Sequence, residues 1–240
     1  MRSVITSDGS FGEDNTLLRT ALFKQVSRAE AAQLIPHLKR WTLNKGGYIF
    51  REGDEDHRMY VLENGRVKLT RQSDDHRVQL LSIHGHGEIL GEIPVFDPTG
   101  GPRTASAVAM TNGTTVVSLE HDDLFAWLDE HPRVAVDMLQ VLARRLRANN
   151  ERFSDLVFMD VPARLAKTLI DLARRFGEPI EAGLMVPHDL TQEEMAQLVG
   201  ASRETVNKAL MDFDNRGWIA RKGRSIIIFQ PGMLIRRSKR

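Results

Sequence analysis

The 240-residue sequence contains no cysteine. Disulfides, thiolate zinc sites, cysteine-ligated iron–sulfur clusters and thiol-based redox sensing are therefore excluded. No apolar run approaches the roughly 18 residues that a membrane-spanning helix requires, so we expect no membrane partner. The stretch from Met1 to Asn15 is polar and acidic without an apolar centre, which predicts a cytoplasmic protein without a signal peptide.

An excess of charge of one sign is also lacking. The 33 basic and 32 acidic residues leave a formal net charge of +1, in a composition typical of a soluble globular protein. Division after Met159 gives 19 basic and 22 acidic residues before it, and 14 basic and 10 acidic residues after it. The two parts carry −3 and +4, which indicates either an acidic module joined to a basic one or a fluctuation with a solvated basic tail.

The first half of the chain has the pattern of an antiparallel β structure. Met59–Leu62 and Val67–Thr70 are apolar runs on either side of Asn64-Gly65, a pair that tolerates positive φ and predicts a β-hairpin. Ten glycines between residues 46 and 113 predict frequent turns, as in a barrel or sandwich. Further strands are expected at 78–83, 104–110 and 114–119.

Helices are expected before and after these strands. Ser27 and Glu30 fit the capping-box pattern and predict a short helix that carries Ala31, Leu34, Ile35 and Leu38. A second short helix is expected at 122–128. A long helix is predicted from His131-Pro132, and Val161-Pro162 marks the expected hinge after it.

The long helix carries a seam of regularly spaced residues. The spacings are 3, 4, 3, 4 and 3 through Leu139, Leu142, Leu146, Asn149, Phe153 and Leu156. This 3.5-residue period predicts a coiled coil, and the simplest partner is the same helix of a second copy. Asn149 then either fixes the register of a homodimer or contacts a ligand across the seam.

The basic half has the spacing of a winged helix-turn-helix. Thr191 to Glu194 form a capping box, Gly200-Ala201 make a tight turn, and Ser202 caps a second helix that begins at Arg203. A hairpin with a basic tip is expected at 218–228. Gly177 to Gly183 is interpreted as a loop.

The second helix of this motif exposes side chains suited to reading DNA. Arginine can donate two hydrogen bonds to guanine, and glutamate can accept from cytosine N4. Glu204 is favoured there either as a base reader or as an ordinary acid near a helix start. We therefore predict double-stranded DNA as a partner, with these candidate contacts: Thr191, Ser202, Arg203, Glu204, Asn207 and Lys208.

The segment from Gly91 to Ser106 has the residues of an anion site. Glycine and the turn offer backbone amides, Arg103 offers a rigid fork for a phosphate, and Thr104 offers a hydroxyl. Glu92 can accept from a sugar hydroxyl. The segment fits a cyclic nucleotide held without hydrolysis, and the alternative is a turn with an Arg–Glu surface ion pair.

Together these motifs resemble the CRP/FNR family, the cyclic-AMP receptor protein family of bacterial transcription regulators. The resemblance rests on Gly91-Glu92…Arg103-Thr104, Ala143-Arg144-Arg145-Leu146 and Gly200-Ala201-Ser202-Arg203-Glu204-Thr205-Val206. Asp160-Val161-Pro162, Asp189-Leu190-Thr191-Gln192-Glu193-Glu194 and Gly217-Trp218-Ile219 are similar to the actinobacterial cyclic-AMP-responsive members.

The resemblance implies roles for individual residues. Glu92 would bind the ribose 2′-hydroxyl, Arg103 and Thr104 the cyclic phosphate with the Gly91 amide, and Ile93 would lie beside them. Asn149 and Asn150 would reach the adenine, one within the subunit and one from its partner. Arg203, Glu204 and Lys208 would read a palindrome similar to TGTGA…TCACA. Apart from what the resemblance implies, we expect activation to involve contact with RNA polymerase through the Gly177–Gly183 loop.

We therefore predict an α+β protein with a β-roll at 15–130, a dimerisation helix at 131–160 and a winged helix-turn-helix at 161–235. The predicted function is a homodimeric regulator gated by cyclic AMP, with no metal and no enzymatic activity. One alternative is a regulator of the same fold that has lost cyclic AMP or uses another nucleotide. The others are a nucleotide-binding module without DNA function, and an enzyme using His84, His86 or His121, which we interpret as exposed turn residues without a paired nucleophile.

Overall fold

The computed structural model describes residues 27, 30 and 33–239. It divides into two compact units, of which the first ends at Leu146 and the second begins at Arg147. Ser27 and Glu30 make the reciprocal bonds of the predicted capping box, with the Ser27 amide 2.7 Å from Glu30 Oε2 and the Glu30 amide 3.2 Å from Ser27 Oγ. Ala31 and the stretch from Met1 to Asn15 lie outside the described residues.

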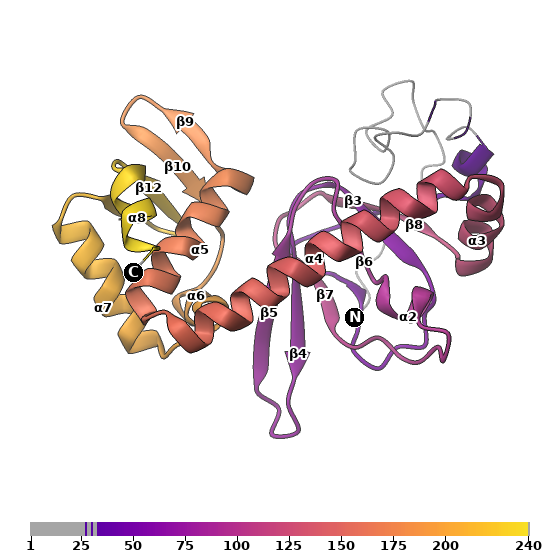
Figure 1. The fold of residues 1–240 in the computed structure, drawn as a ribbon, viewed down its shortest axis with the longest axis horizontal. Coiled ribbons are helices and arrows are strands. Elements are labelled where there is room, and N and C mark those ends of the chain that lie inside the picture. The colour runs from indigo at the N-terminus through magenta and orange to yellow at the C-terminus, as the bar shows by residue number, and fades with distance from the viewer. Residues whose placement is uncertain (1–26, 28–29, 31–32, 240) are drawn as a thin grey trace. The chain divides into compact units, whose positions relative to one another are not determined.

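Two antiparallel sheets form the body of the first unit (Figure 1). Their strand orders are β1-β8-β3-β6 and β2-β7-β4-β5. The strands are β1 Lys39–Leu43, β2 Tyr48–Phe50, β3 Met59–Asn64, β4 Val67–Gln72, β5 Val78–His84, β6 Ile89–Leu90, β7 Ser106–Ala109 and β8 Thr114–Leu119. A core cluster that includes Phe50, Leu62 and Val67 is buried with side chains from both sheets, so the predicted β-roll is confirmed.

The predicted hairpin at Asn64-Gly65 is wrong. β3 pairs with β6 and β8, whereas β4 pairs with β5 and β7, so this turn carries the chain from one sheet to the other. The turn chemistry is as expected, because Gly65 has a φ of +88°. Every residue of β3 from Met59 to Glu63 is buried, and pairing with strands distant in sequence provides that burial.

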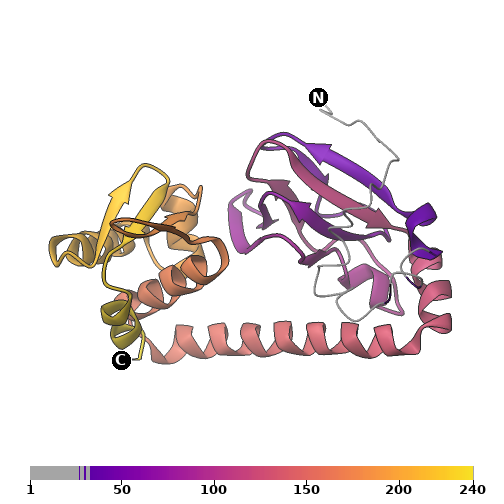
Figure 2. The same cartoon turned by 90° about the horizontal axis from the view of Figure 1, so that it is seen from above.

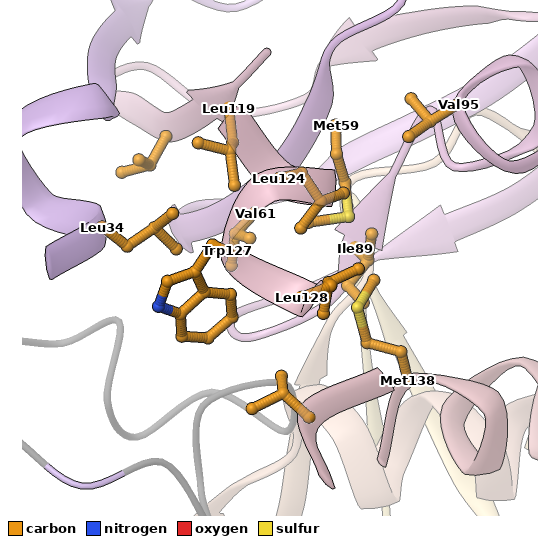
Figure 3. Close-up of a cluster of buried hydrophobic side chains, with 12 residues drawn as sticks. Leu34, Met59, Val61, Ile89, Val95, Leu119, Leu124, Trp127, Leu128 and Met138 are labelled. Carbon is orange, nitrogen blue, oxygen red and sulfur yellow. The ribbon is translucent and has the colours of Figure 1, made fainter. Parts of the chain in front are cut away.

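Helices cover the outer face of the sheet that contains β3. The short helix α2 spans Ile93–Phe96, α3 spans His121–Glu130, and α4 spans Pro132–Phe158. Leu124 and Trp127 of α3 and Met138 of α4 pack against side chains of β3 and β6 (Figure 3). The helices predicted at 122–128 and from His131-Pro132 are therefore confirmed, and both pack against the sheet.

The predicted seam residues of α4 are uncovered in the single chain. α4 is one continuous helix (Figure 2), and Leu139, Leu146, Phe153 and Leu156 are 65%, 63%, 71% and 50% exposed. Apolar side chains at this spacing and exposure indicate a surface that another helix covers.

The second unit combines helices with an antiparallel sheet of strand order β11-β12-β10-β9. Its elements are α5 Val161–Phe176, β9 Glu178–Ile180, β10 Gly183–Pro187, α6 Gln192–Val199, α7 Arg203–Asn215, β11 Ile219–Lys222, β12 Ser225–Ile228 and α8 Pro231–Arg237. α6, α7 and the β11–β12 hairpin confirm the predicted winged helix-turn-helix. Asp160 caps α5 by accepting from the Ala163 amide at 2.9 Å.

Two expectations for this unit are wrong. Gly177 to Gly183 is not a loop, because Glu178–Ile180 forms the edge strand β9 and pairs with β10. Of the basic residues near the C-terminus, Arg236 and Arg237 belong to α8, so these two are not part of a solvated tail. Pro231 begins α8, Leu234 is fully buried, and the two basic residues of the helix lie in its last turn.

The interpretation of the three histidines also needs correction. His84 is the last residue of β5, is 8% exposed, and its Nε2 lies 2.8 Å from Ser82 Oγ, so it is neither exposed nor unpaired. His84 Nδ1 lies 2.7 Å from Glu88 Oε2. His121 begins α3 and contacts Asp122 at 2.8 Å, whereas His86 lies in a turn as expected.

Two kinds of feature are absent from the described residues. None of their helices combines the length and apolar character needed to cross a lipid bilayer. None of their histidine, aspartate and glutamate side chains gather in threes with a geometry that could hold a metal ion.

Candidate functional site

Arg103 forms the centre of the first candidate site. Its side chain is buried, and its guanidinium donates from Nη1 to Gly91 O at 2.6 Å and from Nη2 to Arg58 O at 2.6 Å. Nη2 also donates to Asp56 Oδ2 at 2.9 Å. The guanidinium carbon lies 4.3 Å from the centre of the Phe50 ring, which adds a cation–π contact. A buried cation is therefore held by dipoles, a carboxylate and an aromatic face.

The Nε donor of this guanidinium remains unused. Nε of Arg103 is buried and has no acceptor among the described residues. Arginine has five N–H donors, and a buried donor without an acceptor is costly. An anionic oxygen placed at Nε would satisfy it, so the site fits the phosphate that the sequence predicts here.

Gly91 allows the guanidinium to lie against the backbone. Its φ is +75°, and a Cβ at this position would overlap Arg103 Nη1 and lie 3.0 Å from Cζ. Any side chain at this position would therefore strain the backbone and displace the guanidinium.

Glu92 lies next to this glycine and is paired with a basic residue from α4. Arg145 Nη1 donates to Glu92 Oε1 at 2.7 Å, and its Nη2 donates to Ile89 O. The Glu92 side chain is 17% exposed. An Arg–Glu ion pair is thus present, as in the alternative interpretation, but its arginine is Arg145 rather than Arg103. Both members of this pair, Glu92 and Arg145, lie beside the anion site.

The structure brings together only part of the predicted ligand set. Gly91, Glu92 and Arg103 are neighbours, with Thr104 exposed beside Arg103 and Ile93 54% exposed at the start of α2. Asn149 and Asn150 are exposed on α4 after Leu146, where the chain belongs to the second unit. The structure therefore does not place them with the other predicted ligand residues.

Sequence reasoning missed four residues around Arg103 and Glu92. Arg145 belongs to the family motif Ala143-Arg144-Arg145-Leu146, but nothing in its spacing marks it as the partner of Glu92. Phe50, Asp56 and Tyr60 lie more than 40 residues before Arg103, and no pattern links them to it. Only the packing of the two sheets makes them neighbours.

A separate cleft of about 580 Å³ lies between α2 and the start of α3. Gly91, Glu92 and Arg103 are not among its lining residues, so the cleft is distinct from the anion site. It is lined by His57, Pro94, Val95, Phe96, Asp97, Pro98, Gly100, Glu120, His121, Asp122 and Phe125.

The helix-turn-helix of the second unit is fixed by its caps. Thr191 and Glu194 form a complete capping box at the start of α6, and the side chain of Ser202 accepts from the Thr205 amide at 3.2 Å to cap α7. Gly200 joins the helices with a φ of +71°. These local features set where α7 begins and which residues lie in its first turns.

The exposed face of α7 is supported by its neighbours. Arg203 Nε donates to Gln192 Oε1 at 3.2 Å, and Arg221 Nη1 of β11 donates to Asn207 Oδ1 at 3.2 Å. Arg203, Glu204 and Lys208 are exposed. The tip of the β11–β12 hairpin adds exposed positive charge through Arg221, Lys222 and Arg224. A hydrogen-bonding helix face beside a basic hairpin is an arrangement that fits the groove and phosphates of a duplex.

Comparison with known families agrees with this division of the chain. Residues 40–131 match the family model of the cyclic nucleotide-binding domain. Residues 163–237 match the model of the Crp-like helix-turn-helix domain.

Individual relatives resemble nearly the whole chain. The CRP-like cAMP-activated global transcriptional regulator of Mycobacterium tuberculosis is 45% identical over 226 residues, which covers 94% of this chain and 100% of that protein. The cyclic AMP receptor protein of Thermus thermophilus is 32% identical over 189 residues, covering 79% and 83%. The solved structure of the c-di-GMP responsive regulator CLP of Xanthomonas campestris has the same fold, with a TM-score of 0.71 and 24% identity over 85% of this chain and 99% of that one.

Proposed function

Because the chain belongs to the CRP family of transcription regulators, we propose that it binds cyclic AMP as a homodimer and then recognises a palindromic TGTGA-type site. Binding there would activate or repress transcription. The domains would be the β-roll at 15–130, the dimerisation helix at 131–160 and the winged helix-turn-helix that binds DNA at 161–235.

The unused Nε donor of the buried Arg103 is the observation that carries the ligand proposal. A charge-assisted bond to a phosphate oxygen would satisfy it. Glu92 retains a second carboxylate oxygen that can accept from the ribose 2′-hydroxyl. The Gly91 amide and the Thr104 hydroxyl would be further phosphate donors, and Ile93 would offer an apolar contact.

Support for the base contacts comes from the family resemblance. Asn149 and Asn150 are exposed amides on α4, and each amide can both donate and accept, as an adenine edge requires. The exposed seam of α4 supports a homodimer, since Leu139, Leu146 and Phe153 would otherwise leave large apolar side chains in water.

On DNA, α7 would lie in the major groove. Arg203, supported at Nε by Gln192, keeps its two Nη groups available for guanine O6 and N7. Glu204 would accept from cytosine N4, and Lys208 and Asn207 would complete the contacts to the site. Ser202 and Thr191, at the starts of α7 and α6, would bind backbone phosphates with their helix N-termini.

Three further proposals complete the functional assignment. The β9–β10 hairpin, which contains the segment expected to contact RNA polymerase, is an exposed candidate for that contact. The protein would act in the cytoplasm, and it would bind its nucleotide without turning it over.

Measuring DNA binding with and without cyclic AMP, at one stated salt concentration, tests the proposal. We expect a TGTGA-type duplex to bind much more tightly when cyclic AMP is present, and Arg203→Ala to lose that binding. Equal binding with and without cyclic AMP would indicate the alternative, a regulator that no longer depends on this nucleotide. Calorimetry with cyclic GMP would then test whether another nucleotide has replaced it.

A further inference from the structure

The carboxylate of Asp56 shares the guanidinium on which the proposed phosphate site depends. We propose that Asp56 is a charge filter, which admits the singly charged phosphodiester of a cyclic nucleotide and disfavours the doubly charged phosphate of the corresponding open 5′-nucleotide. This inference rests on the proposed function, because it concerns the same site.

Asp56 is held in place by donors from several parts of the first unit. Its Oδ2 accepts from Arg103 Nη2 at 2.9 Å and from the Tyr60 hydroxyl at 2.8 Å. Its Oδ1 accepts from the Arg58 amide at 3.1 Å. The side chain is 19% exposed. A carboxylate with these partners cannot swing away from an arriving phosphate without losing several hydrogen bonds at once.

The carboxylate is ionised at neutral pH. Burial opposes its ionisation, but the hydrogen bonds from Arg103 and Tyr60 outweigh burial and hold the pKa of Asp56 below its usual value. The charged and titratable groups around it are Arg103, Tyr60 and Arg58, and Arg58 Nε lies 3.2 Å from Glu120. The Glu92 carboxylate, next to Gly91 in the chain, is paired with Arg145. The Asp56 carboxylate therefore shares its guanidinium with the unused Nε donor.

Geometry places a bound phosphate close to this negative charge. A phosphate oxygen at Nε and the Asp56 oxygen at Nη2 would bond the same planar guanidinium, which separates the two anions by roughly 5 Å. A second negative charge on the ligand would then lower its affinity by on the order of tenfold in a partly solvated site.

The two ligand classes differ in the charge that Asp56 would sense. A cyclic nucleotide carries one negative charge on its phosphodiester at every relevant pH. A 5′-nucleotide carries close to two above its second phosphate pKa of about 6, and close to one below it. The filter therefore predicts that discrimination against the 5′-nucleotide weakens as the pH falls.

Calorimetry with cyclic AMP and 5′-AMP on the full chain tests the inference, at about pH 8 and about pH 5.5, on either side of the phosphate pKa. We expect the wild type to prefer cyclic AMP about tenfold more strongly at the higher pH than at the lower. In Asp56→Asn, the affinity for 5′-AMP relative to that for cyclic AMP should rise about tenfold, and only at the higher pH. Since both proteins carry the same histidines and the same Glu92, the difference between them isolates Asp56.

Asp75→Asn is the matched control, because Asp75 is an exposed carboxylate in the β4–β5 turn of the same unit, paired with Arg77. It should leave the preference unchanged. A role for Asp56 that is merely structural would weaken both ligands alike and leave their ratio constant at both values of pH.

The outcomes separate this inference from the function on which it rests. A wild type that binds cyclic AMP but keeps the same preference at both pH values overturns the filter and leaves the proposed function intact. So does an Asp56→Asn protein with an unchanged ratio. A wild type that binds no cyclic AMP overturns the proposed function and the filter together. If Asp56→Asn does not fold, a wild-type preference that is the same at both pH values would still overturn the filter.

Discussion

Arg103 shows how one residue serves both stability and binding. Its charge is buried among Gly91, Arg58 and Asp56 and under the Phe50 ring, which compensates most of the cost of removing a cation from water. The remaining cost lies at Nε, and a phosphate oxygen would remove it. The ligand would therefore complete a hydrogen-bond set that folding leaves incomplete.

We expect Gly91→Ala to reduce cyclic AMP affinity at least tenfold and to destabilise the protein by about 2 kcal/mol. The new methyl group would overlap Arg103 Nη1 and would also sit at a positive φ. Gly113→Ala is the control, since its φ is +68° and no atom lies within 4 Å of an added Cβ. It shares the backbone strain without the overlap, so both variants should be less stable but only Gly91→Ala should bind poorly by calorimetry. Equal affinities would contradict the role of Gly91.

The pH dependence of stability offers a second test at this scale. The pKa of Asp56 is lowered in the folded protein, because its bonds to Arg103 and Tyr60 outweigh the effect of burial. A lowered pKa contributes stability above the unfolded value of about 3.9, and this contribution is lost as the pH falls through the folded value. Urea unfolding should therefore show Asp56→Asn about 2 kcal/mol less stable than the wild type near neutral pH. The difference should shrink below about pH 4, and a difference that persists there would contradict the assignment.

How far the residues of the site can be predicted from sequence depends on their separation along the chain. Gly91, Glu92, Arg103 and Thr104 lie within one short segment, so an anion site can be predicted from the sequence of that segment alone. Asp56 comes from a loop that only the packing of the two sheets brings to Arg103. Nothing in the sequence distinguishes it from the neighbouring Asp54, which accepts from the Arg51 amide instead.

At the scale of elements, α4 carries a surface that the single chain cannot cover. We expect Leu146→Asp to raise the dissociation constant of the dimer at least 100-fold, because each interface would bury two new carboxylates. Sedimentation velocity would measure the change. Ala148→Asp introduces the same charge at an exposed position off the seam and should leave the dimer intact. Dimers of normal stability in Leu146→Asp would place the interface elsewhere.

The recognition helix and the hairpin should contribute differently to DNA binding. Arg203→Ala should remove about 1–3 kcal/mol of preference for one guanine. Arg224→Ala should weaken binding to all sequences alike and should reduce the slope of log K against log salt concentration by about 1. Fluorescence anisotropy with specific and scrambled duplexes over a salt series measures both effects. A change of base preference in Arg224→Ala would contradict a phosphate contact at the hairpin tip.

Local signals predicted the elements of this fold better than their pairing. The caps at Thr191 and Ser202 placed α6 and α7 correctly, because a cap depends on residues three positions apart. Asn64-Gly65 predicted a turn but not its strand partners, since pairing is decided by burial across the whole β-roll. The edge strand β9 and the helix α8 were missed because both are short and only one anchor, Leu234, marks the latter.

For the whole molecule, the net charge of +1 is the sum of opposite charges on two parts of the chain. The part before Asp160 carries −3 and contains the nucleotide site, whereas the part from Asp160 carries +4 and contains the reader. A small positive excess gives weak attraction to any duplex, so affinity must come from well-placed contacts rather than from bulk charge. Such a protein is suited to control by a ligand that sets geometry.

Thermodynamic linkage then provides the most stringent test of the proposed gating. If cyclic AMP raises the affinity for the palindrome by some factor, the palindrome must raise the affinity for cyclic AMP by the same factor. Couplings of this kind are typically about 1–3 kcal/mol, or roughly 5- to 150-fold. We expect calorimetry of cyclic AMP binding to show this increase when the palindrome is present and a much smaller one with a scrambled duplex of equal length. In Arg103→Gln the nucleotide should no longer tighten DNA binding, although the unliganded protein should bind the palindrome as the wild type does. Equal cyclic AMP affinities with and without the palindrome would mean that nucleotide binding and DNA binding are uncoupled, and gating by cyclic AMP would have to be abandoned.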